Sequence, residues 1–308
     1  LWEATHRSAI VELLDALAEA SVDTVLMKGT ALAYSIHDEP AARRRGDSDL
    51  LVNPASLDQT RAVLTECGWY RNDDPHGLTH QEGWLHDCAG HFTHALDLHW
   101  EPSDRPVVQR VLSREDFFAN PHKLTRLGEH AYRPDHALTL MHEAINQEWH
   151  RLHGYWAEEG RVKGGRRLVW SVDFDLLANA MDEAGWERLV ALCERRGVGP
   201  LVADALRGAA GDLGTELPVE MLAKLDAQTL DPDLATYFQT TDTLGEFWLD
   251  LRTARSWAER IRMIRERGFP PRAHLVEKYP QHSGWPTALL QGRLLLETAG
   301  RVWRRVNA

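Results

Sequence analysis

Two aspartates separated by one residue begin an apolar run, and a third aspartate lies inside a later one. The pair belongs to residues 47–52 (DSDLLV), and the third acid is Asp97 within residues 94–100 (HALDLHW). Side chains alternate along a strand, so Asp47 and Asp49 project from one face with backbones roughly 7 Å apart. Carboxylate oxygens are the ligands that Mg²⁺ or Mn²⁺ prefers. The pattern predicts a divalent-cation site formed by Asp47, Asp49 and Asp97.

Asp97 shares its strand face with His99, whereas the apolar side chains lie on the opposite face: Leu96, Leu98 and Trp100. A half-buried carboxylate needs a compensating partner, such as a metal ion or an arginine. His99 could orient Asp97 or an acceptor substrate. A pair of surface acids and a solvated Asp97 remain the alternative.

A lysine and a glycine, Lys28-Gly29-Thr30, stand where an apolar run meets a helical pattern. Glycine lets backbone N–H groups approach a ligand, and a helix N-terminus attracts an anion such as phosphate. Lys28 would add a point charge. The alternative is a glycine that serves turn geometry alone.

The elements that must position these residues alternate between helix and strand. Apolar spacing predicts a helix within 2–20, a strand at 22–27, a helix opened by Gly29, a strand at 47–52 and a helix that follows Asn53-Pro54 and reaches Cys67. Further strand-like pieces are expected at 69–71, 78–85 and 91–100. We therefore expect an α/β (α+β) fold with a mixed sheet.

After residue 133 the pattern becomes helical. Helices are expected at 135–150, 168–181, 185–196, 200–210, 232–267 and 286–305. The chain is thus predicted to divide into an α/β domain at 1–133 and a helical, acceptor-side domain at 134–308.

Composition excludes several classes of function. The 308 residues carry a formal charge of −11, which argues against a general electrostatic grip on nucleic acid or an anionic membrane. No apolar run approaches the roughly 18 residues of a membrane span. Three cysteines form no CxxC pair, which fits reduced thiols and a cytoplasmic location.

Taken together, Lys28-Gly29-Thr30-Ala31-Leu32, Arg43, residues 46–52 and Asp97-Leu98-His99-Trp100 resemble the nucleotidyltransferase superfamily, which has the DNA polymerase beta-like fold. More narrowly, they resemble its uncharacterised bacterial nucleotidyltransferase-like family. His142, His150 and Trp170-Ser-Val-Asp173 extend the resemblance, which covers residues 22–180.

The resemblance implies nucleotide binding at Lys28, Gly29, Thr30 and Arg43, and catalytic metal binding at Asp47, Asp49 and Asp97. It implies a transferase that moves a nucleoside monophosphate, most simply AMP from ATP, with Mg²⁺ or Mn²⁺. The acceptor would be a hydroxyl, phosphate or carboxylate of a small molecule, sugar or peptide, as in natural product biosynthesis, and pyrophosphate would leave. No nucleic acid or membrane partner is expected.

Two other classes stay open. One is a catalytically silent relative that binds a nucleotide or a partner, and the other is a metal-dependent phosphotransferase or phosphohydrolase that uses the same acids.

Two other polar segments, one rich in histidine and one basic, suggest further binding sites. Six histidines lie within 76–99, but their spacing forms no recognised zinc ligand set. The loop 151–167 is basic, and its Arg166 could clamp phosphate or an anionic acceptor as readily as it could be solvated. With His99 and Arg166, His142 completes the residues expected near the acceptor.

Overall fold

The computed structural model describes residues 1–72, 80–89, 91–157, 160–240 and 242–306. Its main sheet has five strands in the order β1 (Thr24–Met27), β2 (Asp47–Val52), β5 (Phe92–His99), β4 (Gln81–Cys88) and β3 (Tyr70–Arg71). The β2–β5 pair is parallel, and the other pairings in this sheet are antiparallel. The mixed sheet and the α/β class are confirmed.

The parallel pair sets the register of the acids. Asp49 is the direct partner of Asp97, and Leu50 is the partner of Leu98. Because side chains at paired positions point to the same face, the sheet itself brings Asp49 and Asp97 side by side.

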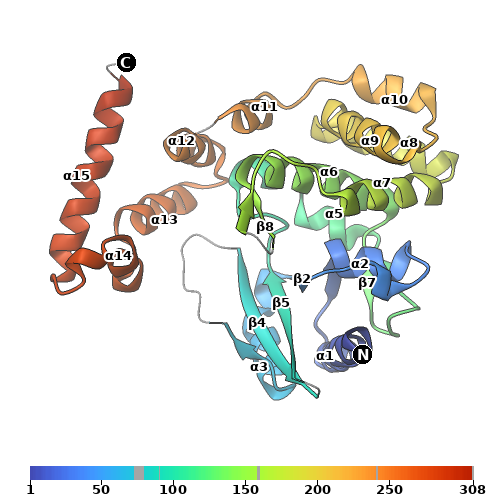
Figure 1. Cartoon of the computed structure of the whole chain (residues 1–308), viewed down its shortest axis with the longest axis horizontal. Helices are drawn as coiled ribbons and strands as arrows, with labels where there is room; N and C mark the ends of the chain where they lie inside the picture. The colour runs from blue at the N-terminus through green and yellow to red at the C-terminus, as the bar shows by residue number, and fades with distance from the viewer. Residues whose placement is uncertain (73–79, 90, 158–159, 241, 307–308) are drawn as a thin grey trace.

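The two faces of the sheet have different environments. Leu50, Leu96 and Leu98 pack in one core with α1 (Trp2–Glu19) and α3 (Leu57–Glu66). Met27 and Leu51 pack on the other side, in a core shared with the helices that follow. Because Asp49 shares its strand face with Leu51, the acids lie on the face toward these helices. Figure 1 shows the later helices gathered on one side of the sheet.

Helix α2 (Lys28–Ser35) starts directly where β1 ends. Later helices are α4 (Pro106–Gln109), α5 (Arg114–Ala119), α6 (His136–His153), α7 (Leu168–Ala180), α8 (Glu183–Arg196), α9 (Gly199–Leu213), α10 (Val219–Asp226), α11 (Pro232–Gln239), α12 (Thr243–Thr253), α13 (Trp257–Gly268), α14 (Arg272–Lys278) and α15 (Thr287–Val306). A short two-stranded sheet is formed by β6 (His122–Lys123) and β7 (Tyr132–Arg133). No described helix has the length and apolarity to cross a membrane.

Two expectations were wrong. The helix expected over 232–267 is three helices, because the side chains of Asp242 and Ser256 each accept a hydrogen bond from a backbone N–H and begin a new helix. The loop expected over 151–167 contains a hairpin of β8 (Tyr155–Ala157) and β9 (Gly160–Val162). Of the strand expected at 78–85, residues 78 and 79 lie outside the described residues.

A buried ion pair joins the loop after α2 to α7. Nε and Nη2 of Arg43 each lie within 2.9 Å of the Asp173 carboxylate, and His37 Nε2 lies 2.9 Å from Asp173 Oδ1. Asp173 is 1% exposed. Since one hydrophobic core also includes Met27 and helices on both sides of residue 133, the division at that residue stays a prediction.

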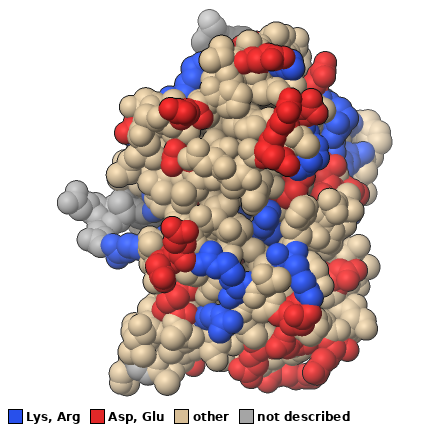
Figure 2. Space-filling view, turned by 90° about the vertical axis from the view of Figure 1, so that its right-hand side faces the viewer, with Lys and Arg blue, Asp and Glu red and all other residues tan. Residues whose placement is uncertain are grey.

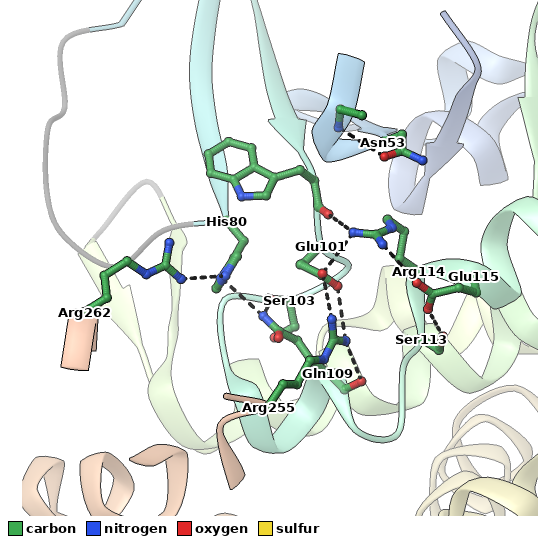
Figure 3. Close-up of polar contacts among 12 residues, drawn as sticks. Asn53, His80, Glu101, Ser103, Gln109, Ser113, Arg114, Glu115, Arg255 and Arg262 are labelled. Atoms are coloured by element: carbon green, nitrogen blue, oxygen red, sulfur yellow. Dashed lines mark hydrogen bonds and ion pairs between the residues drawn. The ribbon is translucent and has the colours of Figure 1, made fainter. Parts of the chain in front are cut away.

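The C-terminal helices attach through a second polar network, drawn in Figure 3. The Glu101 carboxylate, just after β5, accepts hydrogen bonds from Arg114 and Arg255. His80 Nε2, just before β4, lies 3.3 Å from Arg262 Nη2. These contacts hold the start of α13 against the loop that follows Asp97 and His99.

We expect Asp173→Asn to lower the free energy of unfolding by about 3–5 kcal/mol, because it leaves the Arg43 guanidinium buried without a counter-charge. Chemical denaturation measures the loss. Asp175→Asn, on the same helix, serves as the control, since Asp175 forms an exposed hydrogen bond with Asn179. Equal effects of the two substitutions would contradict a stabilising role for the Arg43–Asp173 pair.

Candidate active site

A cleft of about 1550 Å³ lies between the acid-bearing face of the sheet and the helices. Typical small-molecule sites occupy about 300–1,000 Å³, so this cleft has room for two substrates. Its sheet side includes Lys28, Asp47, Asp49, Asp97 and His99, and its far side includes α12 and α13. The five residues named on the sheet side were all expected at the site, and the structure brings them together in this one cleft.

The formal charge of −11 is unevenly spread over the surface. On the face that Figure 2 shows, Lys and Arg side chains gather across the middle, at about the height of α2 and β7, and Asp and Glu gather below them. On this face of an acidic chain, basic and acidic side chains are thus partly separated.

Asp49 is the central acid. Its Oδ1 lies 2.5 Å from Lys28 Nζ and 3.0 Å from His99 Nε2. The three side chains come from β2, from the β1–α2 junction and from β5. One carboxylate oxygen therefore ties together all three elements that form the sheet side of the cleft.

The charges of this group depend on one another. Burial alone would lower the pKa of Lys28, but Asp49 raises it above the ordinary lysine value. Burial alone would raise the pKa of Asp49, but Lys28 and His99 hold it below its usual range. Lys28 is thus an ammonium that balances the Asp49 carboxylate.

The other two acids carry charge at a cost. Asp47 reaches the open part of the cleft. Partial burial by the surrounding protein, followed by the charges of Asp49 and Asp97, raises its pKa to about 6. Burial and the charge of Asp49 also raise the pKa of Asp97. Additional positive charge would relieve this repulsion.

A divalent cation fits this donor set. Ligand atoms of Asp49, Asp97 and His99 lie within 4.8 Å of one another, and Asp47 lies next along the same strand face. The cluster differs from the expected set because it includes His99 and not Asp47. Carboxylates suit Mg²⁺, and the imidazole nitrogen also suits Mn²⁺.

The turn between β1 and α2 has an unusual backbone. Lys28 has φ 49°, in the left-handed region that non-glycine residues rarely adopt. Such conformations cost of order 1–3 kcal/mol and gather at functional sites. A Cβ added to Gly29 would lie 3.3 Å from Cβ of Arg45, so this glycine also permits close packing.

Two residues expected to bind the nucleotide have protein partners. The hydroxyl of Thr30 is fully buried, bonded to Ser48 and Arg45, and does not line the cleft. Arg43 lines the cleft, but its Nε and Nη2 contact Asp173 and its Nη1 donates to the Arg44 carbonyl. The Thr30 side chain therefore supports the turn, and a nucleotide contact by Arg43 stays a prediction.

Of the residues expected beside the acceptor, His99 and His142 line the cleft and Arg166 does not. His142 lines the cleft, and burial, followed by the charge of Lys28, lowers its pKa to about 3, so its ring is neutral. Arg166 instead contacts Asp204 of α9, and its neighbour Arg167 lines the cleft. An acceptor contact by Arg166 therefore stays a prediction, and of the two neighbours it is Arg167, the residue just before α7, that lines the cleft.

The histidine-rich segment supplies no second metal group among the described residues, where Asp49, Asp97 and His99 form the one such cluster. His94 packs against Trp2 and His6, and His76 lies outside the described residues.

Glu143 is a site residue that the sequence analysis missed. It lines the cleft from α6, is 4% exposed, and has a pKa raised to about 7 by burial and then by the charge of Asp173. The available signal was a charged residue within a mostly apolar stretch of a predicted helix, between Met141 and Ile145.

Comparison with known proteins gives one family match. Residues 3–213 match a protein family described as uncharacterised nucleotidyltransferase. The crystal structure of an antigenic nucleotidyltransferase-like protein from Paracoccidioides brasiliensis is similar at 12% sequence identity and a TM-score of 0.43, over 75% of this chain and 96% of that chain. The search of curated proteins found no match.

The raised pKa of Glu143 predicts a pH-dependent cost. The unfolded carboxyl ionises near 4.5 and the folded one near 7, so stability is lost as pH rises between these values. We expect Glu143→Gln to match wild type near pH 4 and to exceed it by about 3 kcal/mol near pH 8.

Denaturation of both proteins across this pH range measures the difference, with Glu148→Gln, outside the cleft on the same helix, as the control. A pH-independent difference would show that Glu143 is not a strained buried acid.

Proposed function

Since the chain belongs to the family of uncharacterised nucleotidyltransferases, we propose that it transfers a nucleoside monophosphate, most simply AMP from ATP, to a small-molecule, sugar or peptide acceptor. The observation that carries this proposal is the register of β2 and β5, which pairs Asp49 with Asp97 beside the Lys28–Gly29 turn. An acid pair next to a helix N-terminus suits a triphosphate with its cation.

Lys28 is placed to bind the triphosphate. Its ammonium lies at the first residue of α2 and already neutralises a carboxylate, so it can contact a phosphate oxygen without a change of protonation. Backbone N–H groups at the start of α2 add to the attraction. Binding would therefore exchange part of the Lys28–Asp49 contact for a Lys28–phosphate contact.

Asp47, Asp49, Asp97 and His99 would hold the divalent cation. When bound, Mg²⁺ or Mn²⁺ would neutralise the negative charge that develops on the transferred phosphoryl group.

Asp97 is the residue we assign to proton transfer. Its carboxylate lines the cleft on the strand face that carries Asp49, where an acceptor oxygen beside the cation would come within hydrogen-bond reach. The acceptor oxygen attacks the α-phosphorus, its proton passes to Asp97, and the bond to the β-phosphate breaks to release pyrophosphate.

The far side of the cleft suits the acceptor. It is built by residues after 213, beyond the family match, and includes Phe247, Trp248 and Phe269 with Arg262. An acceptor with an apolar body, as in peptide or small-molecule natural products, would suit this side.

We expect Mg²⁺ with ATP to raise the melting temperature of wild type, because a ligand at 100 times its Kd adds roughly 2.7 kcal/mol to stability. The gain should vanish in Asp47→Asn/Asp49→Asn. A matched control, Asp58→Asn/Glu66→Gln, removes the same number of charges from the exposed surface of α3 and should keep the gain. An unchanged shift in the site variant would place the triphosphate elsewhere.

Asp97→Asn should still bind the triphosphate but lose turnover by about 10²-fold or more, the effect of losing a positioned base. Pyrophosphate release in the presence of candidate acceptors measures turnover, and thermal shift on the same preparation measures binding. Full activity in this variant would refute proton transfer by Asp97, and release of inorganic phosphate would favour a phosphohydrolase.

A further inference from the structure

One wall of the cleft carries Glu143, a buried acid with an oxygen that no described protein group satisfies. Glu143 is 4% exposed, and its Oε1 is buried without a hydrogen-bond partner among the described residues. A buried carboxyl without partners is costly, and it is retained in proteins mainly where a ligand supplies the missing donors.

Glu143 belongs to a polar stripe along α6. Asn146 and His150 follow it at the three- and seven-residue spacings that share one helix face, and all three line the cleft. Along the helix, the stripe therefore presents the carboxylate of Glu143, the amide of Asn146 and the imidazole ring of His150.

Aromatic side chains fix the outer end of the stripe. The Trp170 ring stacks with His150 at 5.9 Å between ring centroids, and the Arg167 guanidinium lies 5.5 Å from its centre. Because these rings are held by packing, they give the cleft a firm apolar end beyond Asn146.

The inner end of the stripe lies toward the phosphate turn. Lys28, Arg43 and Asp49 line the same cleft as Glu143, and their charges act on its carboxyl. A triphosphate bound at Lys28 would therefore extend its ribose along α6, whereas the acceptor approaches Asp97.

We propose that Glu143 accepts hydrogen bonds from the vicinal ribose hydroxyls of the nucleotide and that Asn146 contacts the edge of its base. The inference rests on the proposed function and deepens it by assigning the nucleoside half of the site. A carboxylate accepts from two hydroxyls at once, and an amide both donates and accepts, which suits the mixed edge of a base.

The test compares each ribonucleotide with its analogue that lacks both hydroxyls. The tightest binder among ATP, GTP, CTP and UTP is titrated calorimetrically with Mg²⁺, followed by its 2′,3′-dideoxy form. In wild type the dideoxy form should bind about tenfold or more weakly, because hydrogen bonds to a charged group are lost.

In Glu143→Ala the two nucleotides should bind within about twofold of each other, because the acceptor of those bonds is gone. Glu143→Gln keeps one acceptor oxygen and should show an intermediate ratio. The matched control is Glu148→Ala, on the same helix but paired with Arg151 outside the cleft, and it should keep the wild-type ratio.

An equal ratio in wild type and Glu143→Ala, or no discrimination in wild type, would overturn the proposal. So would a fall in melting temperature of Glu143→Ala with both nucleotides weakened equally, which is the effect of a purely structural residue. These outcomes leave the proposed function standing if binding still requires Asp47 and Asp49, whereas absence of binding by any triphosphate contradicts the function itself.

Discussion

The contact of Asp49 with both Lys28 and His99 is the interaction on which the site depends. It exists because β2 and β5 pair in parallel, which places His99 two residues beyond the partner of Asp49, and because β1 ends next to β2. Lys28 thereby serves as the resident positive charge of an acidic cluster. Such a site can accept a divalent cation together with a triphosphate. The cation replaces the positive charge that Lys28 supplies to Asp49, and the triphosphate gives Lys28 a new anionic partner.

Two ion pairs connect the helical part of the chain to the sheet part on either side of the cleft. Arg43 spans from the loop after α2 to Asp173 of α7, and Arg255 spans from the turn before α13 to Glu101 after β5. Arg43 and Asp173 are both buried, and breaking such a pair by removing one partner costs several kcal/mol, so this pair favours one arrangement of the walls. The Arg255 side chain is 42% exposed, so its pair with Glu101 contributes less. The cleft between these two ion pairs has a sheet side with the acids, an α6 wall with Glu143, and a C-terminal side on which aromatic side chains lie among charges of both signs.

Local pattern was sufficient for the parts of the fold that follow strand alternation. It placed Asp47, Asp49 and Asp97 on strand faces and Leu96 and Leu98 in the core, since a period of two is fixed by the backbone. It could not show that Thr30 and Arg43 already have partners, because Ser48 and Asp173 approach them only through tertiary packing. The same limit hid Glu143, whose lack of a partner is a property of the folded cleft, and the breaks between α11, α12 and α13, which depend on capping side chains.

The central claim is that the acids paired across β2 and β5 form a divalent-cation site next to the Lys28 turn. Diffraction from crystals soaked in Mn²⁺ with a triphosphate, recorded where manganese scatters anomalously, tests it most directly. The account predicts an anomalous peak within coordination distance of Asp49 and Asp97, with Lys28 Nζ on a phosphate oxygen. A peak elsewhere, or an intact Lys28–Asp49 contact with no manganese beside it, would contradict the account.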